Sequence, residues 1–439
     1  MKKKYIKNIR FIVLIYFAFA GNVWAQPNIV SDLNTRHITA RCAGLGGAIA
    51  PLVDDASALH LNPSGLAKMK KTGFVLSGNL AARMGGLTEN GSVPNYSSSS
   101  ITDNDPMFGI EQADLGIRLG HGFGLGLGYA KYSNFSRLKE KWEVKQYNSG
   151  STGYDRLEYN YHGALHVASA GLGFALGKQE NGGVSAGIAV NQLFGNREMA
   201  YDKKFVVNGS TTSSTVYQVK AGYSALFISY GLQWSSAEKN QGSGSESGAF
   251  QNQYTLSIHG NLPYWRLNNV TASQGAPNAV GKTNTYKPGT MVFAAAGKFI
   301  RNKTTYSTAF ITPVIQYEWT DLDQNREYYP TTQTQGTPLT GMTSNRLGVG
   351  LEFSNTYDDM VPRLGIHTLQ YAVKNGSGVS NPGKQPTGWG VSGGFGNEFM
   401  DMTMRLDFFK SEKVLVYSNG AGIDYKGVVL SLMVTYRFM

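Results

Sequence analysis

Hydrophobic and polar residues alternate along the last segment of the chain. Every even position from 428 to 438 is apolar, ending in Tyr436 and Phe438, whereas the odd positions include Ser431 and Arg437. Successive side chains of a β-strand point to opposite faces, so a period of two separates a wholly apolar face from a mixed one. The segment therefore predicts a strand whose apolar face meets lipid, with aromatic residues at its end.

The same period of two recurs along most of the chain. In 399–409 the even positions are apolar, and the odd positions include Asp401 and Arg405. In the first eight residues of 123–133, the odd positions are Phe, Leu or Tyr and the even positions are Gly or Ala. We predict about fourteen strands, at 72–83, 112–120, 123–133, 161–177, 183–195, 216–234, 253–263, 289–300, 307–319, 344–354, 361–374, 387–396, 399–409 and 427–438.

The expected connections between these strands alternate in length. Long connections are predicted at 84–111, 134–160, 196–215, 264–288, 320–343, 375–386 and 410–426, and short ones at 121–122, 178–182, 301–306, 355–360 and 397–398. Long loops at one end and short turns at the other are typical of an outer-membrane barrel. The exception is the Gly- and Ser-rich stretch 235–252, which falls where a short turn is expected.

Composition argues against long soluble helices, coiled coils and charged disordered tails. Charged residues make up 16% of the chain and aromatic residues 12%, against roughly 25% charged residues in an average soluble protein. No stretch beyond the N-terminal leader reaches 18 consecutive apolar residues, which leaves a closed barrel as the structure that could span a bilayer. Stacked soluble β-sandwiches would alternate in the same way, but their second face would carry charge rather than Gly and Ala.

The N-terminus has the features of a secretory signal. Five basic residues in the first ten positions precede the apolar run 11–20, and small residues precede Gln26. We predict a signal peptide at 1–25, cleaved before Gln26. Without these five basic residues the formal net charge falls from +11 to +6, which is too small to favour nucleic acid as a partner. The single cysteine, Cys42, lies past the cleavage site and has no partner for an internal disulfide.

Residues 26–71 lack strand alternation. They end in a turn-forming motif, Asn62, Pro63, Ser64 and Gly65, in which proline biases the preceding residue toward an extended conformation and asparagine bonds its own backbone. From the residues alone, this is a capped, turn-rich segment that precedes the first strand.

The motifs of this segment resemble those of the FadL/TodX family of outer-membrane transporters. The likeness lies in Gly-Leu-Gly-Gly-Ala at 44–48, Asp-Asp-Ala-Ser at 54–57 and Asn-Pro-Ser-Gly-Leu at 62–66, followed by strands of the right number. The resemblance implies a fourteen-stranded barrel plugged by an N-terminal hatch, with Ser64 in the place of the family's alanine. It implies a fold that is all-β, a transmembrane antiparallel barrel of about 14 strands, with a hatch at 26–71 and the barrel at 72–439.

The sequence shows no motif for catalysis, a cofactor or a metal ion. Gly281-Lys282-Thr283 lacks the glycine that a phosphate-binding loop needs at position 276. His162 and His166 share a face of one predicted strand, and we expect them to line the lumen or its rim without a ligand. Eight charged residues lie on the strand faces opposite the apolar ones: Asp114, Arg118, Arg346, Glu352, Asp401, Arg405, Asp407 and Arg437. They are expected to form ion pairs inside the barrel, or else to form a path for a fatty-acid carboxylate with an arginine as its anchor.

The expected function is passive uptake of hydrophobic molecules, such as long-chain fatty acids, across the bacterial outer membrane. The expected partners are hydrophobic small molecules, outer-membrane lipid and lipopolysaccharide, with no nucleic acid, and the protein is expected to be a monomer and not an enzyme. The alternative is a non-transporting barrel that serves as a scaffold or shuttle in protein secretion, whose components share this signature. An open porin is disfavoured because of the hatch-like segment.

Overall fold

The computed structural model describes the chain from residue 39 onward, with gaps. The described residues are 39–90, 100–102, 107–120, 122–134, 139–144, 153–176, 182–207, 210–237, 239–240, 251–272, 281–287, 289–303, 308–321, 326–329, 334–335, 343–355, 360–370, 387–416 and 422–438. The predicted signal peptide, 1–25, and the first part of the predicted hatch lie outside them.

Two short helices and one 3-10 helix precede the strands. They are α3 (Ala40–Gly44), α4 (Ala58–Leu61) and η1 (Pro63–Lys68). Thr39 accepts a hydrogen bond from the backbone N–H of Cys42 and so caps α3, and the fixed φ of Pro63 suits the first position of η1. Within the parts of the chain that the structure describes, no helix is both long and apolar enough to cross a membrane.

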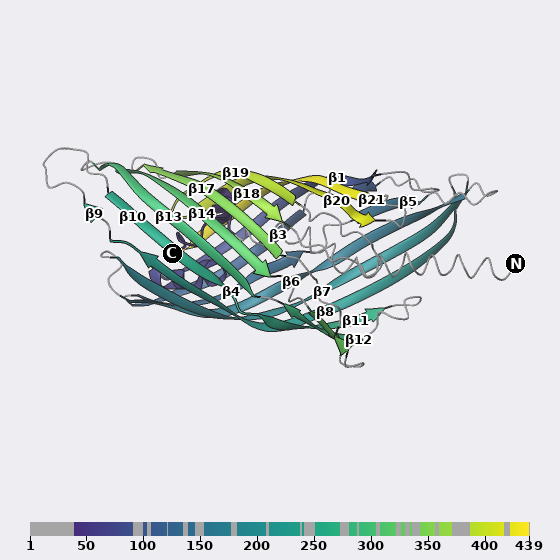
Figure 1. The fold of residues 1–439 in the computed structure, drawn as a ribbon, viewed down its shortest axis with the longest axis horizontal. Helices are drawn as coiled ribbons and strands as arrows, with labels where there is room; N and C mark the ends of the chain where they lie inside the picture. The colour runs from purple at the N-terminus through teal and green to yellow at the C-terminus, as the bar shows by residue number, and fades with distance from the viewer. Residues whose placement is uncertain are drawn as a thin grey trace.

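The strands form one antiparallel barrel of fourteen strands (Figure 1). The barrel strands are β1 (Gly73–Asn90), β3 (Met107–Gly120), β4 (Phe123–Asn134), β6 (Gly153–Leu176), β7 (Gly183–Val207), β8 (Ser210–Ser235), β10 (Gln251–Asn261), β13 (Thr290–Lys303), β14 (Thr308–Asp321), β17 (Thr343–Asn355), β18 (Val361–Gln370), β19 (Thr387–Gly396), β20 (Met400–Val416) and β21 (Gly422–Phe438). Shorter strands extend this wall: β2 (Ser100–Thr102), β5 (Lys139–Val144), β9 (Lys239–Asn240), β11 (Tyr264–Ala272), β12 (Gly281–Lys287), β15 (Arg326–Tyr329) and β16 (Thr334–Gln335).

Pairing of the first strand with the last closes the barrel. β1 runs antiparallel to β21 from the pair Phe74 and Phe438 to the pair Asn90 and Gly422, without a register shift. A closed ladder leaves no strand edge, which lets the backbone donors and acceptors be satisfied inside a lipid bilayer. The all-β barrel fold and strand count predicted from the sequence are therefore confirmed.

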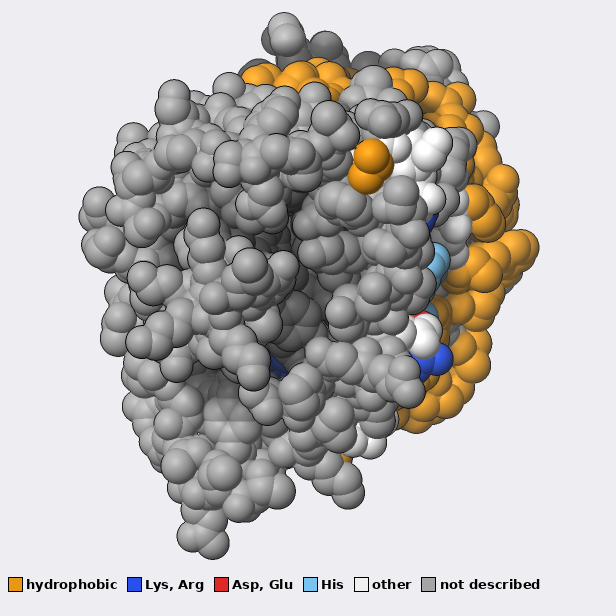
Figure 2. Space-filling view, turned by 90° about the vertical axis from the view of Figure 1, so that its right-hand side faces the viewer, with side chains coloured by type: hydrophobic (Ala, Val, Ile, Leu, Met, Phe, Trp, Pro, Cys, Tyr) orange, Lys and Arg blue, Asp and Glu red, His pale blue; other side chains and the backbone are white. Residues whose placement is uncertain are grey.

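The two faces of the strands differ as the alternation predicts. On β21, Leu430 and Tyr436 point outward and are 38% and 46% exposed, whereas Ser431 and Thr435 point into the lumen and are buried. Figure 2 shows hydrophobic side chains gathered along the outer flank of the barrel. Such an apolar exterior around a polar interior is the arrangement of a strand wall that spans lipid.

Aromatic side chains cluster at both ends of this apolar exterior. At the short-turn end, Phe74 lies 6.1 Å from Phe438 between ring centroids. Toward the long-loop end, Trp389 stacks on Phe408 at 4.6 Å. Outer-membrane barrels carry aromatic girdles at the two membrane interfaces, so these pairs mark the height of the lipid-facing band.

The predicted strand boundaries are wrong at the long-loop end. β6, β7 and β8 have 24, 25 and 26 residues, and they run through stretches 153–160, 196–207 and 210–215 that were expected to be loops. The three strands project past their neighbours in Figure 1. Beyond the lipid the outer face needs no apolar residues, so hydrogen-bonded pairing continues there without the alternation that the prediction used. Part of 264–288 is likewise strand, in β11 and β12.

An arginine scan of outward leucines tests the height of the lipid-facing band. Leu127 lies in the middle of β4 and is 53% exposed, whereas Leu176 is the last residue of β6 and is 65% exposed. Leu127→Arg should destabilise the folded barrel by about 2–4 kcal/mol because it places a charge near the bilayer midplane, and Leu176→Arg by about 0–1 kcal/mol because the interface hydrates it. Urea unfolding in lipid bilayers measures both values, and equal losses would contradict the assigned band.

Candidate functional site

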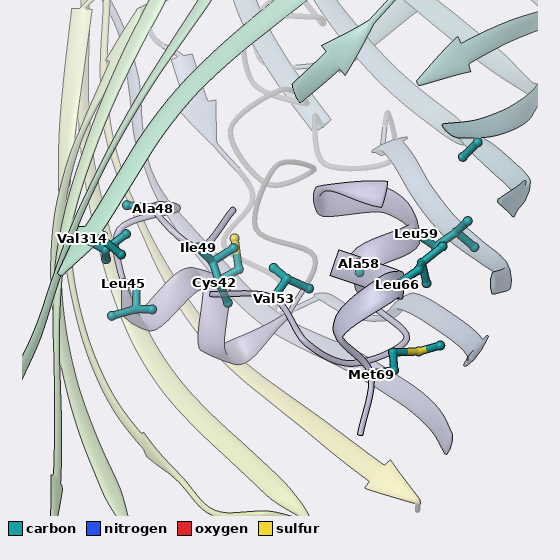
Figure 3. Packing of buried hydrophobic residues seen from close by; sticks show 12 residues of the cluster. Cys42, Leu45, Ala48, Ile49, Val53, Ala58, Leu59, Leu66, Met69 and Val314 are labelled. Carbon is teal, nitrogen blue, oxygen red and sulfur yellow. The ribbon is translucent and has the colours of Figure 1, made fainter. Parts of the chain in front are cut away.

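Residues 39–71, which we call the N-terminal segment, lie inside the barrel and touch its wall on opposite sides. Helix α3 contacts β18 to β21, whereas η1 contacts β4, β6, β7 and β8. In Figure 3, Leu45 and Ala48 lie beside Val314 of β14, while Leu59 and Leu66 point toward the strands at the other side. The segment therefore crosses the lumen and packs its own apolar core against the wall.

Asn62 organises the turn at the start of η1. Its Oδ1 accepts hydrogen bonds from the backbone N–H of Ser64 at 3.3 Å and from the Ser64 hydroxyl at 2.8 Å, and its Nδ2 donates to the carbonyl of Ala50 at 3.0 Å. Asn62 and Ser64 are fully buried. From the wall, Gln233 donates to the Pro51 carbonyl at 2.7 Å. The motif thus joins two turns of the segment to each other and to β8.

Glycines of the wall make room for this motif. A Cβ at Gly231 would lie 2.1 Å from Oδ1 of Asn62, and one at Gly187 would lie 2.3 Å from the backbone of Pro63. On the opposite wall, a Cβ at Gly365 would lie 2.1 Å from the backbone nitrogen of Gly46, which itself has φ +64°. The glycines that alternate with apolar residues in the strands are therefore contact sites for the N-terminal segment.

Ion pairs hold the segment on the short-turn side. Arg41 of α3 pairs with Glu352 at 3.0 Å, and Arg437 of the last strand pairs with Asp55 at 2.8 Å. Burial raises the pKa of the Asp55 carboxyl, but Arg437 and a hydrogen bond from Ser57 outweigh it, so the net shift is downward and Asp55 stays ionised. Its stabilising contribution is present above its ordinary pKa and is lost as the pH falls through the lowered value.

The predicted pairing of lumen charges is confirmed for most of the acids and arginines of the wall. Arg363 lies 2.8 Å from Glu352, and Arg405 lies 2.7 Å from Asp407. Arg437 pairs with Asp401 as well as with Asp55. For Arg118 the structure differs from the prediction, because its guanidinium donates to the backbone carbonyl of Lys70. Sequence alone gave no means to find that the N-terminal segment supplies several of the partners.

One Ser, His and Asp constellation lies between the segment and the wall. His60 of α4 places Nε2 3.0 Å from Asp114 and Nδ1 3.4 Å from the hydroxyl of Ser169. That hydroxyl donates to Oδ1 of Asn191 at 2.6 Å, so its proton is directed away from the imidazole that would have to accept it. We interpret the constellation as an anchor for α4. None of the described residues form a group of three or more His, Cys, Asp or Glu suited to a metal ion.

A cavity of about 210 Å³ lies on the long-loop side of the N-terminal segment. Its apolar lining comes from Ile49 and Leu61 of the segment and from Val167, Phe227 and Val292 of the wall. Polar side chains also face it, among them His259, Gln316, Glu318 and Arg346. The cavity therefore offers apolar surface beside hydrogen-bonding groups, as ligand pockets usually do.

An apolar patch on the lumen face continues from this cavity toward the long-loop end. Phe227 stacks on Tyr264 with ring centroids 4.7 Å apart, in a buried cluster. The cluster comprises Leu165, Val167, Leu193, Ala221, Tyr223, Ala225, Phe227 and Tyr264. Sequence reasoning missed these residues, although a signal exists: segments such as 223–227 carry apolar residues on both faces, where a purely polar lumen would need alternation.

The wall beside the cavity has an interrupted ladder. The described pairing of β3 with β4 runs from Gly120 and Phe123 to Gln112 and Ala130, and resumes only between β2 and β5. In between, the Nζ of Lys131 lies 3.4 Å from Glu111, and Lys131 also lines the cavity. Side chains rather than backbone hydrogen bonds therefore join the two strands at this point.

The two histidines do not share the expected environment. His166 lies on the outward face of β6, where its ring stacks on Tyr129 at 5.5 Å and its Nδ1 lies 2.6 Å from the tyrosine hydroxyl. Between it and His162, Gly163 has φ +103°, but the pairing of β6 with β7 continues through it without a register shift. The prediction that His166 lines the lumen or its rim is wrong, because Leu165 and Val167 are the buried, lumen-facing neighbours and alternation turns the residue between them outward.

Neither a protein-family model nor a curated protein matches the sequence. Among solved structures, a Pseudomonas aeruginosa FadL homologue aligns over 90% of this chain and 97% of its own, with TM-score 0.52 and 14% identity. The CymD monoaromatic hydrocarbon channel aligns with TM-score 0.48 and 14% identity, over 92% and 98% of the two chains. The P. putida toluene transporter TodX gives 0.49 and 10%, over 90% and 97%. The chain thus shares the barrel fold of the FadL homologue.

Cys42 provides a reporter for release of the N-terminal segment. It is the only cysteine of the chain and is 1% exposed, and burial raises the pKa of its thiol to about 12. Asn62→Ala would leave the Ala50 carbonyl and the Ser64 N–H without their partner, at a cost of about 1–3 kcal/mol. Labelling of Cys42 by a thiol reagent should then be at least about tenfold faster in the folded barrel.

The matched control is Asn261→Ala, whose amide donates to the carbonyl of its chain neighbour Leu262. Its labelling rate should equal that of the unchanged protein. An Asn62→Ala barrel that labels no faster would show that the Asn62 hydrogen bonds do not hold the segment in place.

Proposed function

We propose that the protein is an outer-membrane channel for the passive uptake of hydrophobic molecules, such as long-chain fatty acids. The observation that carries this proposal is the apolar lining of the lumen, at Phe227, Val167 and Val292, next to a closed and lipid-facing barrel. A water-filled pore for polar solutes would be lined by polar side chains rather than by buried aromatic ones. The proposed ligand class also agrees with the fold shared with the FadL homologue.

The proposed hatch comprises residues 26–71, with Asn62, Pro63, Ser64 and Gly65 as the motif that fixes its position. The described part of this segment spans the lumen and buries Leu45, Leu59 and Leu66 against the wall. A fourteen-stranded barrel is wider than the eight-stranded barrels that side chains alone can fill, so another element has to occupy the interior. The hatch would then keep water and ions out while apolar solutes pass beside it.

The interrupted ladder between β3 and β4 is the proposed side exit. The cavity reaches it at Lys131 and Tyr132. Passage of a hydrophobic solute from the lumen directly into lipid is favourable, because the apolar surface of the solute is then not exposed to water. The driving force for such passage is the concentration gradient.

Filling the cavity tests the proposed route. Ala130 points into the cavity from β4 and is 5% exposed, whereas Ala170 points outward from the neighbouring strand β6. Ala130→Phe should lower the uptake of a radiolabelled long-chain fatty acid by cells that lack their own channel by roughly tenfold, because the ring occupies the space of the solute. This factor corresponds to about 1.4 kcal/mol.

Ala170→Phe is the control and should take up the fatty acid at the unchanged rate. Because overpacking can cost about 1–3 kcal/mol, both variants are first compared for heat-modifiable mobility on gels. Two folded variants with equal uptake would contradict passage through the cavity.

Deletion of residues 30–66 tests the role of the hatch. The strands begin at Gly73 and close without this segment, so the shortened chain should still form a barrel. In planar bilayers it should conduct ions steadily, whereas the intact protein should stay largely closed. If both forms show the same low conductance, the segment is not the plug. The alternative, a scaffold or shuttle in protein secretion, would then be favoured.

A further inference from the structure

The gap between β3 and β4 is bounded by intact ladders on both sides. β3 stays paired with β1 as far as Met107, and β4 stays paired with β6 as far as Asn134. Between β3 and β4 themselves, the described pairing ends at Gln112 and Ala130. The wall therefore has an opening of limited height, and the long-loop cavity reaches it at Lys131.

A β-bulge in β3 lies at the start of this gap. The register of β3 against β1 shifts by one residue at Glu111. Glu111 and Gln112 are consecutive and both buried, whereas Ile110 is 50% exposed on the outward face. A bulge bends its strand and interrupts regular pairing, so β3 leaves β4 at the height where the buried carboxylate of Glu111 lies.

The side chain of Lys131 crosses the wall through the gap. Lys131 is paired with the outward-facing His166 of β6, and directly opposite residues of antiparallel strands share a face, so its stem leaves β4 on the outward side. Its Nζ nevertheless lies 3.4 Å from Glu111, and Lys131 lines the cavity in the lumen. A Cβ at Gly109 would collide with this Nζ, so the ammonium group lies against the backbone of β3.

In this position the ammonium group is an obstacle to an apolar solute that leaves through the gap. Lys131 and Glu111 are both buried, and the pair occupies the opening between the two strands. A lysine stem is flexible and can lie along an apolar surface while its charge stays in water. Because the stem starts on the outward face, rotation about its own bonds would carry the charge out of the gap.

The membrane interface is within reach of Lys131. It lies four residues beyond Leu127, the middle of β4, on the side of the long loops. That separation is roughly 13 Å along the strand at ~3.3 Å per residue, and the apolar band of an outer-membrane barrel is about 25 Å tall. An outward-turned Lys131 could therefore place its ammonium group at the hydrated edge of the band.

The gap belongs to the long-loop cavity. A second cavity, of about 360 Å³, lies on the short-turn side of the N-terminal segment, where Lys68 and Val184 are among its lining residues. None of the residues that line this short-turn cavity belongs to β3 or β4. Lys131 thus stands between lipid and the long-loop cavity alone.

We propose that Lys131 is the gate of the side exit. Paired with Glu111 it closes the gap between lumen and lipid, and turned outward it opens the gap to an apolar solute. The gate rests on the proposed function, because it regulates the exit of the proposed channel. The ion pair that replaces backbone pairing between β3 and β4 is the contact that has to break.

A thiol beside the gate reports whether lipid reaches the lumen. In a Cys42→Ala protein in liposomes, Ala130→Cys provides a single cysteine on the cavity side of the gap. N-dodecylmaleimide partitions into the bilayer, whereas a charged thiosulfonate reagent stays in water. Lys131→Ala clears the gap, so it should speed labelling by N-dodecylmaleimide at least about tenfold and leave labelling by the charged reagent unchanged.

Two outcomes would overturn the gate. Equal N-dodecylmaleimide rates with and without Lys131→Ala would show that another group closes the gap. Faster labelling by both reagents would show that the substitution loosens the barrel rather than opening a path to lipid.

Lys71→Ala is the matched control, since Lys71 also pairs with a glutamate, Glu398, at 3.0 Å, but lies at the short-turn end. Its labelling rates should equal those of the starting protein. Lys131→Arg keeps a positive group within reach of Glu111 and should label as slowly as the starting protein. If Lys131→Arg labels as fast as Lys131→Ala, the ion pair does not close the gap and the proposal is wrong.

A second variant covers a failure to fold. Lys131→Ala leaves the buried Glu111 without the lysine, so all variants are first compared for heat-modifiable mobility on gels. If Lys131→Ala does not fold, Glu111→Gln takes its place, because it keeps the lysine and removes the attraction that holds it in the gap. Labelling by N-dodecylmaleimide should then rise selectively, and an unchanged rate in the folded barrel would contradict the gate.

Failure of the gate is distinguishable from failure of the proposed function. Uptake that depends on Ala130, together with labelling that ignores Lys131, would refute the gate alone. Labelling that depends on Lys131, without any uptake by the intact protein, would refute the channel and leave an opening in the wall that Lys131 closes.

Discussion

Satisfaction of backbone hydrogen bonds in lipid is the constraint on which this structure depends. The unbroken ladder between β1 and β21 joins the last strand to the first, and the outward positions are then free to be apolar. Closure with fourteen strands, however, creates a lumen too wide for side chains to fill. The lumen is instead occupied by the N-terminal segment, whose own polar groups then have to be satisfied inside the barrel.

The N-terminal segment meets this demand with two kinds of contact. Where its backbone approaches the wall, the strands carry glycine, as at Gly187, Gly231 and Gly365. Where its charged side chains approach, the strands carry partners, as Glu352 does for Arg41 and Arg437 does for Asp55. In the sequence these glycines and charged residues cannot be told apart from other lumen-facing residues. In the structure they are the wall positions that contact the N-terminal segment.

The period of two was sufficient to predict the barrel, its strand number and the lipid-facing positions, since side-chain direction in a strand depends only on parity. It did not predict the full length of β6 to β8, because these strands continue beyond the lipid, where no apolar face is required. It also did not place His166, which points outward from β6 between the buried Leu165 and Val167. The cavities could not be predicted, because Ile49 and Val292 or Lys68 and Val184 meet only after the segment folds back into the lumen.

Helix η1 connects the two sides of the lumen. Its first residues carry the Asn62 motif, which fixes the segment against Gly187 and Gly231, and its last residue is Lys68, which faces the short-turn cavity. The helix has six residues, so its two ends lie close together. Its first residue, Pro63, borders the long-loop cavity. The contacts that fix the Asn62 motif on the wall therefore also determine where Pro63 and Lys68 lie at the two cavities.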